Sequence, residues 1–204
     1  MKREHATKSL LPSGYRQLEY IQGTGTQYID TGVSAPQGFK AFVKMEWTTP
    51  ETDKFVIGSH NTGSPYGRNG LSSYVTNKNK WQLSTGNAYP GGGTLFSGII
   101  YNCEVCTYRG ESYLNINGTR VINSTDNQVR SSLNLLFFTS QYAIYMRQSK
   151  SKFRLLEATI YDHLGNLVRD YAPKLRVQDS KPGLYDFVTE LFYTNAGTGE
   201  FLYN

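Results

Sequence analysis

The chain has 204 residues, of which 38% are hydrophobic, so its length suits one domain with a buried core. The 21 Lys and Arg exceed the 16 Asp and Glu by only 5 charges, and apart from one cluster they are scattered, which does not indicate a nucleic-acid binder. No apolar run approaches about twenty residues, which excludes a membrane-spanning helix. The 20 Gly, 16 Tyr and 10 Phe favour strands and turns over a helical bundle or a coiled coil.

Residues 1–10 form a polar, basic arm. Such an arm is usually frayed unless something binds it, and we predict that Lys2, Arg3 and Lys8 anchor the chain to a neighbouring subunit. The arm lacks the apolar core of a signal peptide. We therefore expect a protein that stays in the cytosol, or leaves it by lysis or within a particle.

From residue 11 the sequence predicts one strand after another. In FKAFVKMEW (39–47) every second residue is apolar, which is typical of a half-buried strand. Asn117-Gly118 lies between two β runs and predicts a type I′ hairpin, and residues 162–166 predict a second hairpin. Turn residues recur about every 8–12 positions, so the pattern predicts an antiparallel sandwich of two sheets.

Two cysteines, Cys103 and Cys106, are spaced as C-x-x-C. A zinc site would need a second ligand pair and a redox motif would need a helix start, and the surrounding YNCEVCTY favours a strand instead. Because side chains alternate along a strand, these two lie on opposite faces. We predict two reduced, structural thiols.

The opening segment LPSGYRQLEYIQGTGTQYIDTGV (11–33), the hairpin SYLNINGTRVIN (112–123) and the closing segment KPGLYDFVTELFYTNAGTGEFLY (181–203) resemble those of a known family. They are similar to concanavalin A-like (laminin-G-like) domains of tail, fibre and other virion proteins of phages of gut bacteria. Similar domains occur in surface and secreted proteins of those bacteria. The resemblance implies an all-β, antiparallel two-sheet jelly-roll sandwich over residues 11–204, in which the first and last strands pair.

Some proteins with this fold are glycoside hydrolases whose E-x-D-x-x-E motif places carboxylates on one face of a strand. The acidic residues spaced i, i+2 in this chain are Glu51 and Asp53, which follow Pro50 in a predicted turn, and Val56 stands where the second Glu would be. We expect a solvated turn here and no enzyme.

Metal-ligand spacing is also missing from the sequence. The histidines and the candidate calcium-binding aspartates are isolated: His5, His60, His163, Asp30, Asp126 and Asp162. We expect neither a metal ion nor a cofactor.

Sugar binding combines aromatic faces with hydrogen-bonding side chains, and residues 60–90 are rich in both. The predicted carbohydrate-binding residues are Tyr66, Arg68, Trp81, Asn87 and Tyr89. Two alternatives remain open, namely that Trp81 belongs to the core and that the tyrosines only pack at a rim.

A basic cluster in MRQSKSKFR contains Arg147, Lys150, Lys152 and Arg154 without an acidic neighbour in the sequence. We expect a solvated hairpin tip, or a contact with an anionic surface.

The resemblance implies a non-catalytic virion accessory protein that adheres to host or mucus glycans. Its partners would be other virion proteins or its own copies, and glycans, with no nucleic acid or membrane partner. The alternatives are a carbohydrate-binding module of a gut bacterium, secreted or on its surface, and a structural virion protein that binds no sugar.

Overall fold

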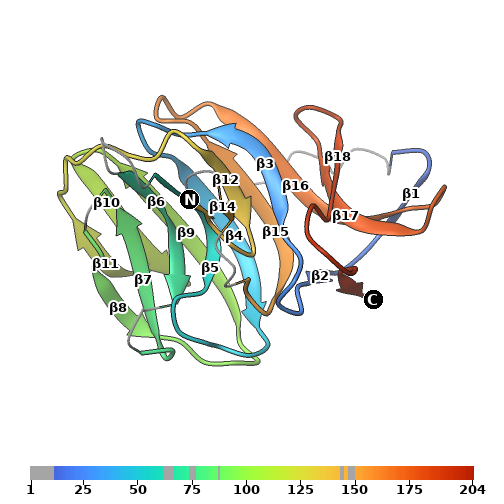
Figure 1. Cartoon of the computed structure of the whole chain (residues 1–204), viewed down its shortest axis with the longest axis horizontal. Coiled ribbons are helices and arrows are strands. Elements are labelled where there is room, and N and C mark those ends of the chain that lie inside the picture. The colour runs from blue at the N-terminus through green and yellow to red at the C-terminus, as the bar shows by residue number, and fades with distance from the viewer. Residues whose placement is uncertain (1–11, 62–66, 74–76, 87, 143–144, 147–149) are drawn as a thin grey trace.

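The computed structural model describes residues 12–61, 67–73, 77–86, 88–142, 145–146 and 150–204, which form two β-sheets (Figure 1). The strands of the larger sheet are β1 (Tyr15–Gln17), β2 (Ile21–Gln22), β4 (Lys40–Trp47), β9 (Ile100–Tyr108), β10 (Glu111–Ile116), β11 (Thr119–Ser124), β15 (Phe153–Tyr161), β16 (Leu167–Arg176), β17 (Lys181–Asp186), β18 (Phe192–Thr194) and β19 (Leu202–Tyr203). The strands of the smaller sheet are β3 (Ile29–Ser34), β5 (Phe55–Asn61), β6 (Gly67–Ser73), β7 (Lys80–Thr85), β8 (Gly91–Thr94), β12 (Asn134–Phe137), β13 (Gln141–Tyr142) and β14 (Tyr145–Met146). The predicted all-β, two-sheet jelly-roll sandwich is confirmed.

The larger sheet runs in the order β11-β10-β9-β4-β15-β16-β17-β18, and the smaller one in the order β14-β13-β5-β6-β7-β8. Among the described strands, neighbours pair antiparallel in both sheets except β13 and β5, which are parallel. That pair is the one departure from the purely antiparallel arrangement that we predicted.

Strand β4 lies between β9 and β15 and shows the predicted alternation. Ala41, Val43, Met45 and Trp47 point into the sandwich and are at most 1% exposed, while the residues between them are half-buried. Burying a side chain such as Met45 stabilises the fold by roughly 1.5–3 kcal/mol.

Strands β5, β6 and β7 differ from β4, because both of their faces are buried. Ile57, Leu71 and Leu83 pair across the three strands and belong to the core cluster. The neighbouring row, Gly58, Gly70 and Ser84, points to the outer face and consists of small residues.

The predicted turns form. Asn117 and Gly118 have φ angles of 51° and 83°, as a type I′ hairpin between β10 and β11 requires. Asp162 accepts hydrogen bonds from the backbone of Leu164 and Asn166 and closes the hairpin between β15 and β16.

The last strand lies beside the opening segment, but the first and last strands do not pair as the resemblance implied, because β1 pairs with β16. Strand β19 pairs with β2 through Leu202 and Gln22. On the opposite side of the sandwich, the glycines of β8 let that strand approach Val121 of β11, because a Cβ atom on Gly92 would overlap the Val121 carbonyl oxygen. The close contact brings together an edge of each sheet.

Both thiols are free and buried, with Cys103 in the core and Cys106 on the other face of β9. Burial raises both pKa values, that of Cys106 to about 11, which agrees with the predicted reduced, structural thiols. None of the described residues forms a helix that could cross a membrane.

Candidate functional site

His60, Arg68 and Tyr89 meet at one corner of the smaller sheet. His60 on β5 lies directly opposite Arg68 on β6, and Arg68 Nε donates to His60 Nε2 at 2.7 Å. Because a guanidinium can only donate, His60 Nε2 is the acceptor in this contact. The Arg68 guanidinium lies over the Tyr89 ring, 4.1 Å from its centroid.

The turn after β7 positions Tyr89. Thr85 and Ala88 exchange two backbone hydrogen bonds, and Gly86, at φ 57°, donates its N–H to the Arg68 carbonyl. A Cβ atom on Gly86 would overlap the Gln128 Cβ atom and lie 2.9 Å from Asp126 Oδ2, so this turn packs closely against residues 126–128. A left-handed glycine therefore supplies both the turn and its close approach to residues 126–128.

The central part of this outer face is buried, whereas Lys80 at the start of β7 is exposed. His60, Ser72, Gln82 and Ser84 are at most 1% exposed, whereas Arg68 is half-buried and Tyr89 is 39% exposed. Among the described residues of this face, a ligand could reach the Arg68–Tyr89 corner, which pairs an aromatic ring with a planar cation.

Trp81 is not part of the corner. It points into the sandwich, is 0% exposed, and packs edge-on against Tyr101 at 5.2 Å, so its ring faces contact other core side chains. The polar neighbours Lys80 and Gln82 suggested exposure, but alternation along β7 directs them to the opposite face. The sequence left open whether Trp81 binds sugar or belongs to the core, and the structure places it in the core.

Two predicted carbohydrate-binding residues, Tyr66 and Asn87, lie outside the described residues, as do the predicted anchors Lys2, Arg3 and Lys8. The structure thus brings together Arg68 and Tyr89 and separates Trp81 from them.

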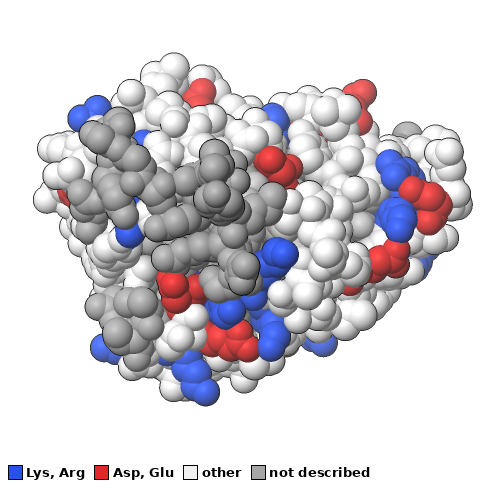
Figure 2. Space-filling view, viewed as in Figure 1, with Lys and Arg blue, Asp and Glu red and all other residues white. Residues whose placement is uncertain are grey.

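The predicted basic cluster does have acidic neighbours, contrary to expectation. Lys152 Nζ lies 2.8 Å from Glu51, and Arg154 lies 3.1 Å from Glu46. Figure 2 shows the same mixing elsewhere on the visible face, where basic and acidic side chains lie next to each other. Arg147 lies outside the described residues.

Glu51 and Asp53 lie in the predicted turn between β4 and β5. The Glu51 carboxylate also contacts Lys54 at 3.4 Å, and the hydrogen bond from Lys152 lowers its pKa. In the described ranges, no three or more His, Cys, Asp or Glu side chains group in a way that could hold a metal ion.

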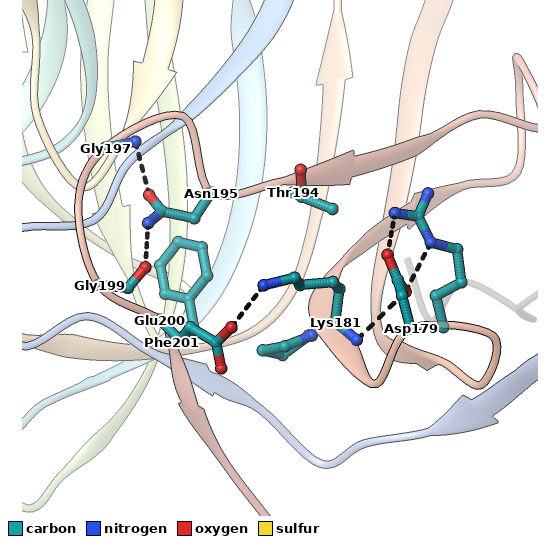
Figure 3. A pocket seen from close by; sticks show the side chains of 10 residues that line it. Asp179, Lys181, Thr194, Asn195, Gly197, Gly199, Glu200 and Phe201 are labelled. Atoms are coloured by element: carbon teal, nitrogen blue, oxygen red, sulfur yellow. Dashed lines mark hydrogen bonds and ion pairs between the residues drawn. The ribbon is translucent and has the colours of Figure 1, made fainter.

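A second location, which the sequence did not indicate, is a polar hollow of about 180 Å³ near the C-terminus (Figure 3). Its walls are the turn between β16 and β17, the start of β17, the end of β18 and the loop before β19. The side chains that line it with charge or amide groups are Arg176, Asp179, Lys181, Asn195 and Glu200.

Two ion pairs border the hollow. Arg176 binds Asp179 through two hydrogen bonds of 3.0 and 2.7 Å, and Lys181 Nζ lies 2.6 Å from Glu200. The bond from Arg176 lowers the pKa of Asp179, and the hydrogen bond to Glu200 raises that of Lys181, so each ion pair favours the charged form of these two groups. The Arg176 guanidinium also lies 5.1 Å from the centroid of the Phe192 ring.

The sequence could not have revealed the hollow. Its loop is held by the opening segment, since Gln27 Nε2 donates to the Glu200 carbonyl at 2.9 Å and Tyr28 N donates to Asn195 Oδ1 at 3.1 Å. Those partners are 173 and 167 residues apart in the chain. The available signal was the pair of opening and closing segments, which turn out to lie against each other.

Similarity to solved structures is found at the level of the fold. A Bacteroides ovatus protein provisionally named as carbohydrate binding matches with a TM-score of 0.60 at 13% identity, over 93% of this chain and 60% of that one. Mouse laminin α1 domains LG4–5 match with a TM-score of 0.49 at 8% identity, over 72% of this chain and 42% of that one. A Trypanosoma rangeli sialidase in complex with sialic acid matches with a TM-score of 0.49 at 9% identity, over 72% of this chain and 27% of that one.

No protein-family model matches the sequence, and no curated protein matches it. The chain spans 60% of the length of the B. ovatus protein, and at 13% identity the likeness concerns the fold alone. The described chain is a lectin-like jelly-roll sandwich.

Proposed function

We propose that this protein is a non-catalytic glycan-binding protein and that the Arg68–Tyr89 corner contacts the sugar. The observation that carries the proposal is the guanidinium stacked on a 39% exposed tyrosine ring and held at Nε by His60. An aromatic ring packs against the C–H face of a pyranose, and a fixed guanidinium can donate to its hydroxyl oxygens. The fold shared with a protein named as carbohydrate binding supports the same function.

The proposal does not include catalysis, because the candidate carboxylate of Glu51 is engaged in ion pairs. Glu51 binds Lys54 and Lys152 in a turn, which is a poor position for a nucleophile or a general acid. A turnover assay on β-glucans should therefore show no hydrolysis, and measurable turnover would contradict this part of the proposal.

A glycan array with the full chain tests binding, followed by affinity measurements on the best glycan. Tyr89→Ala and Arg68→Met should each weaken binding by about tenfold or more, because Tyr and Arg at the centre of a contact contribute most to affinity. The matched control is Arg120→Met, which removes a guanidinium 3.7 Å from the Tyr113 ring on the larger sheet and should leave affinity unchanged. No binder on the array for folded protein, or unchanged affinity in both corner variants, would refute the proposal.

We further propose the setting that the resemblance implies, a phage virion accessory protein anchored through Lys2, Arg3 and Lys8 to other virion proteins or to its own copies. The support is the similarity of segments 11–33 and 181–203 to those of virion proteins. Mass spectrometry of purified particles should find the chain, and deletion of residues 1–10 should remove it from them. Recovery only from bacterial surfaces or culture medium would favour the alternative of a bacterial carbohydrate-binding module. Recovery from particles together with an empty glycan array would favour a structural virion protein.

A further inference from the structure

We infer that the polar hollow near the C-terminus is a second, separate binding site and that it accepts a single neutral sugar ring. Its position on β16–β18 and the loop before β19 separates it in the fold from the Arg68–Tyr89 corner on β6 and β7 (Figures 1 and 3).

The size of the hollow limits its ligand. A volume of about 180 Å³ corresponds to roughly six water molecules and falls below the roughly 300–1,000 Å³ of pockets for drug-sized ligands. One monosaccharide ring is of the appropriate size, and a longer glycan would have to leave through the open side.

The charges of the hollow select a neutral, hydroxylated ligand. Two cations, Arg176 and Lys181, are balanced by two carboxylates, Asp179 and Glu200, so an anionic or a cationic ligand gains no net attraction. A hydroxyl group both donates and accepts hydrogen bonds, and it can therefore use a carboxylate and an adjacent cation together. Neighbouring hydroxyls of a pyranose present this combination repeatedly.

The four charged groups remain within reach of solvent. The Lys181 and Glu200 side chains are 47% and 60% exposed, and those of Arg176 and Asp179 are 35% and 38% exposed. Lys181 has three N–H donors and each carboxylate oxygen has two lone pairs, so one ion pair does not exhaust their hydrogen-bonding capacity.

The walls are organised before a ligand arrives. In Figure 3 the Asn195 side chain reaches both Gly197 and Gly199, with hydrogen bonds of 2.8 Å to the Gly197 N–H and the Gly199 carbonyl. A Cβ atom on Gly197 would collide with the Thr26 carbonyl oxygen, so the loop packs tightly on the opening segment. A preorganised site loses less conformational entropy on binding, which favours even a small ligand.

The test is a two-dimensional ¹H–¹⁵N NMR titration of the full chain with galactose, glucose, mannose and N-acetylglucosamine, and with glucuronate as the charged comparison. A neutral sugar should cause saturable shifts in the amides of residues 179–181 and 194–200, with a dissociation constant in the millimolar range. Lys181→Met and Glu200→Gln should each weaken this binding by about tenfold or more. The NMR spectrum itself reports whether each variant is folded.

The chain offers a matched control in Lys152→Met, which removes the lysine of another surface ion pair, at 2.8 Å from Glu51. This variant should bind as the wild type does. Tyr89→Ala should leave the shifts in the hollow unchanged, so failure of the corner and failure of the hollow are distinguishable.

Three results would overturn the inference. They are no saturable shift in the hollow with any neutral sugar, tighter binding of glucuronate than of the neutral sugars, and unchanged binding in both hollow variants. Unchanged binding in both hollow variants would assign the ion pairs to bracing the loop, and tighter binding of glucuronate would show that Arg176 and Lys181 select an anionic ligand instead.

Discussion

Arg130 and Arg68 lie at the same end of the sandwich, where Gly67 packs against the backbone of Arg130. Arg130 is 0% exposed, and its guanidinium donates to the carbonyls of Thr107 and Gln128 at 2.7 and 2.6 Å and to Asp126 Oδ2 at 2.8 Å. Arg68 instead lies half-buried on the surface tyrosine of the corner.

The difference separates a structural arginine from a candidate binding residue. Burial penalises the charged form of Arg130 and lowers its pKa, and the interaction with Asp126 opposes that shift. Its donors are directed at backbone carbonyls at the end of β9 and in its own loop. Arg68 has a partner on one edge and an aromatic ring on one face, which leaves it at the boundary with solvent.

The largest effect is expected when the buried arginine is removed. Arg130→Met should lower the free energy of unfolding by about 3–5 kcal/mol, because it leaves a partly buried Asp126 and several carbonyls without their donor. Urea unfolding measures this value. Arg120→Met, at an exposed arginine, is the control and should stay within about 1 kcal/mol of the wild type. A loss below about 1 kcal/mol for Arg130→Met would contradict the interpretation of Arg130 as a structural arginine in contrast to Arg68.

A smaller effect is expected where the two regions touch. A Cβ atom on Gly67 would lie 2.6 Å from the Arg130 carbonyl carbon, a backbone atom that cannot move alone. Gly67→Ala should therefore cost about 1–3 kcal/mol and also weaken glycan binding by displacing Arg68. Gly14→Ala is the control, since it has open space around it and a φ of 85°, so it tests backbone strain without a clash. Full stability in Gly67→Ala would show that the two regions are not tightly packed.

Alkaline pH should lower the free energy of unfolding through groups at this same end of the molecule. Burial raises the pKa of Cys106 from 9.0 to about 11, and that of Tyr108, whose carbonyl accepts from Arg130, to about 12. The unfolded thiol ionises first, so stability is complete below pH 9 and falls as the pH rises toward 11. Urea unfolding across this range should show a shallower decline for Cys106→Ser than for the wild type. Parallel declines would mean that Cys106 ionises equally in both states.

The smallest effect on stability is expected at the corner. Tyr89→Ala should change the free energy of unfolding by no more than about 0.5 kcal/mol, because the ring is 39% exposed, while it weakens glycan binding. Thermal unfolding combined with the affinity measurement checks both parts. A large loss of stability would place Tyr89 with Arg130 as a structural residue.

Much of the fold could be predicted, because its signals are local. Alternation in residues 39–47 placed Met45 and Trp47 in the core, and Asn117-Gly118 predicted its own hairpin. Both signals depend on backbone preferences and on the alternating faces of a strand, which act over a few neighbouring residues.

The candidate site was predicted only in part. Arg68 and Tyr89 were identified from their residue types, and the structure brought them together. Trp81 was misplaced because the polar character of its neighbours was given more weight than its alternation with Gln82. The ion pair of Lys152 with Glu51 was missed because its partners are 101 residues apart.

The amino-acid sequence alone was sufficient to predict an all-β sandwich with two unpaired, structural thiols and the hairpin turns at residues 117–118 and 162–166. Only the tertiary structure decided which face Trp81 occupies, which carboxylates neutralise the basic cluster, and that residues 24–28 support a hollow built by residues 176–201. The reason is physical: strand and turn preferences are properties of adjacent residues, whereas a site forms where the two sheets bring distant segments within hydrogen-bonding distance.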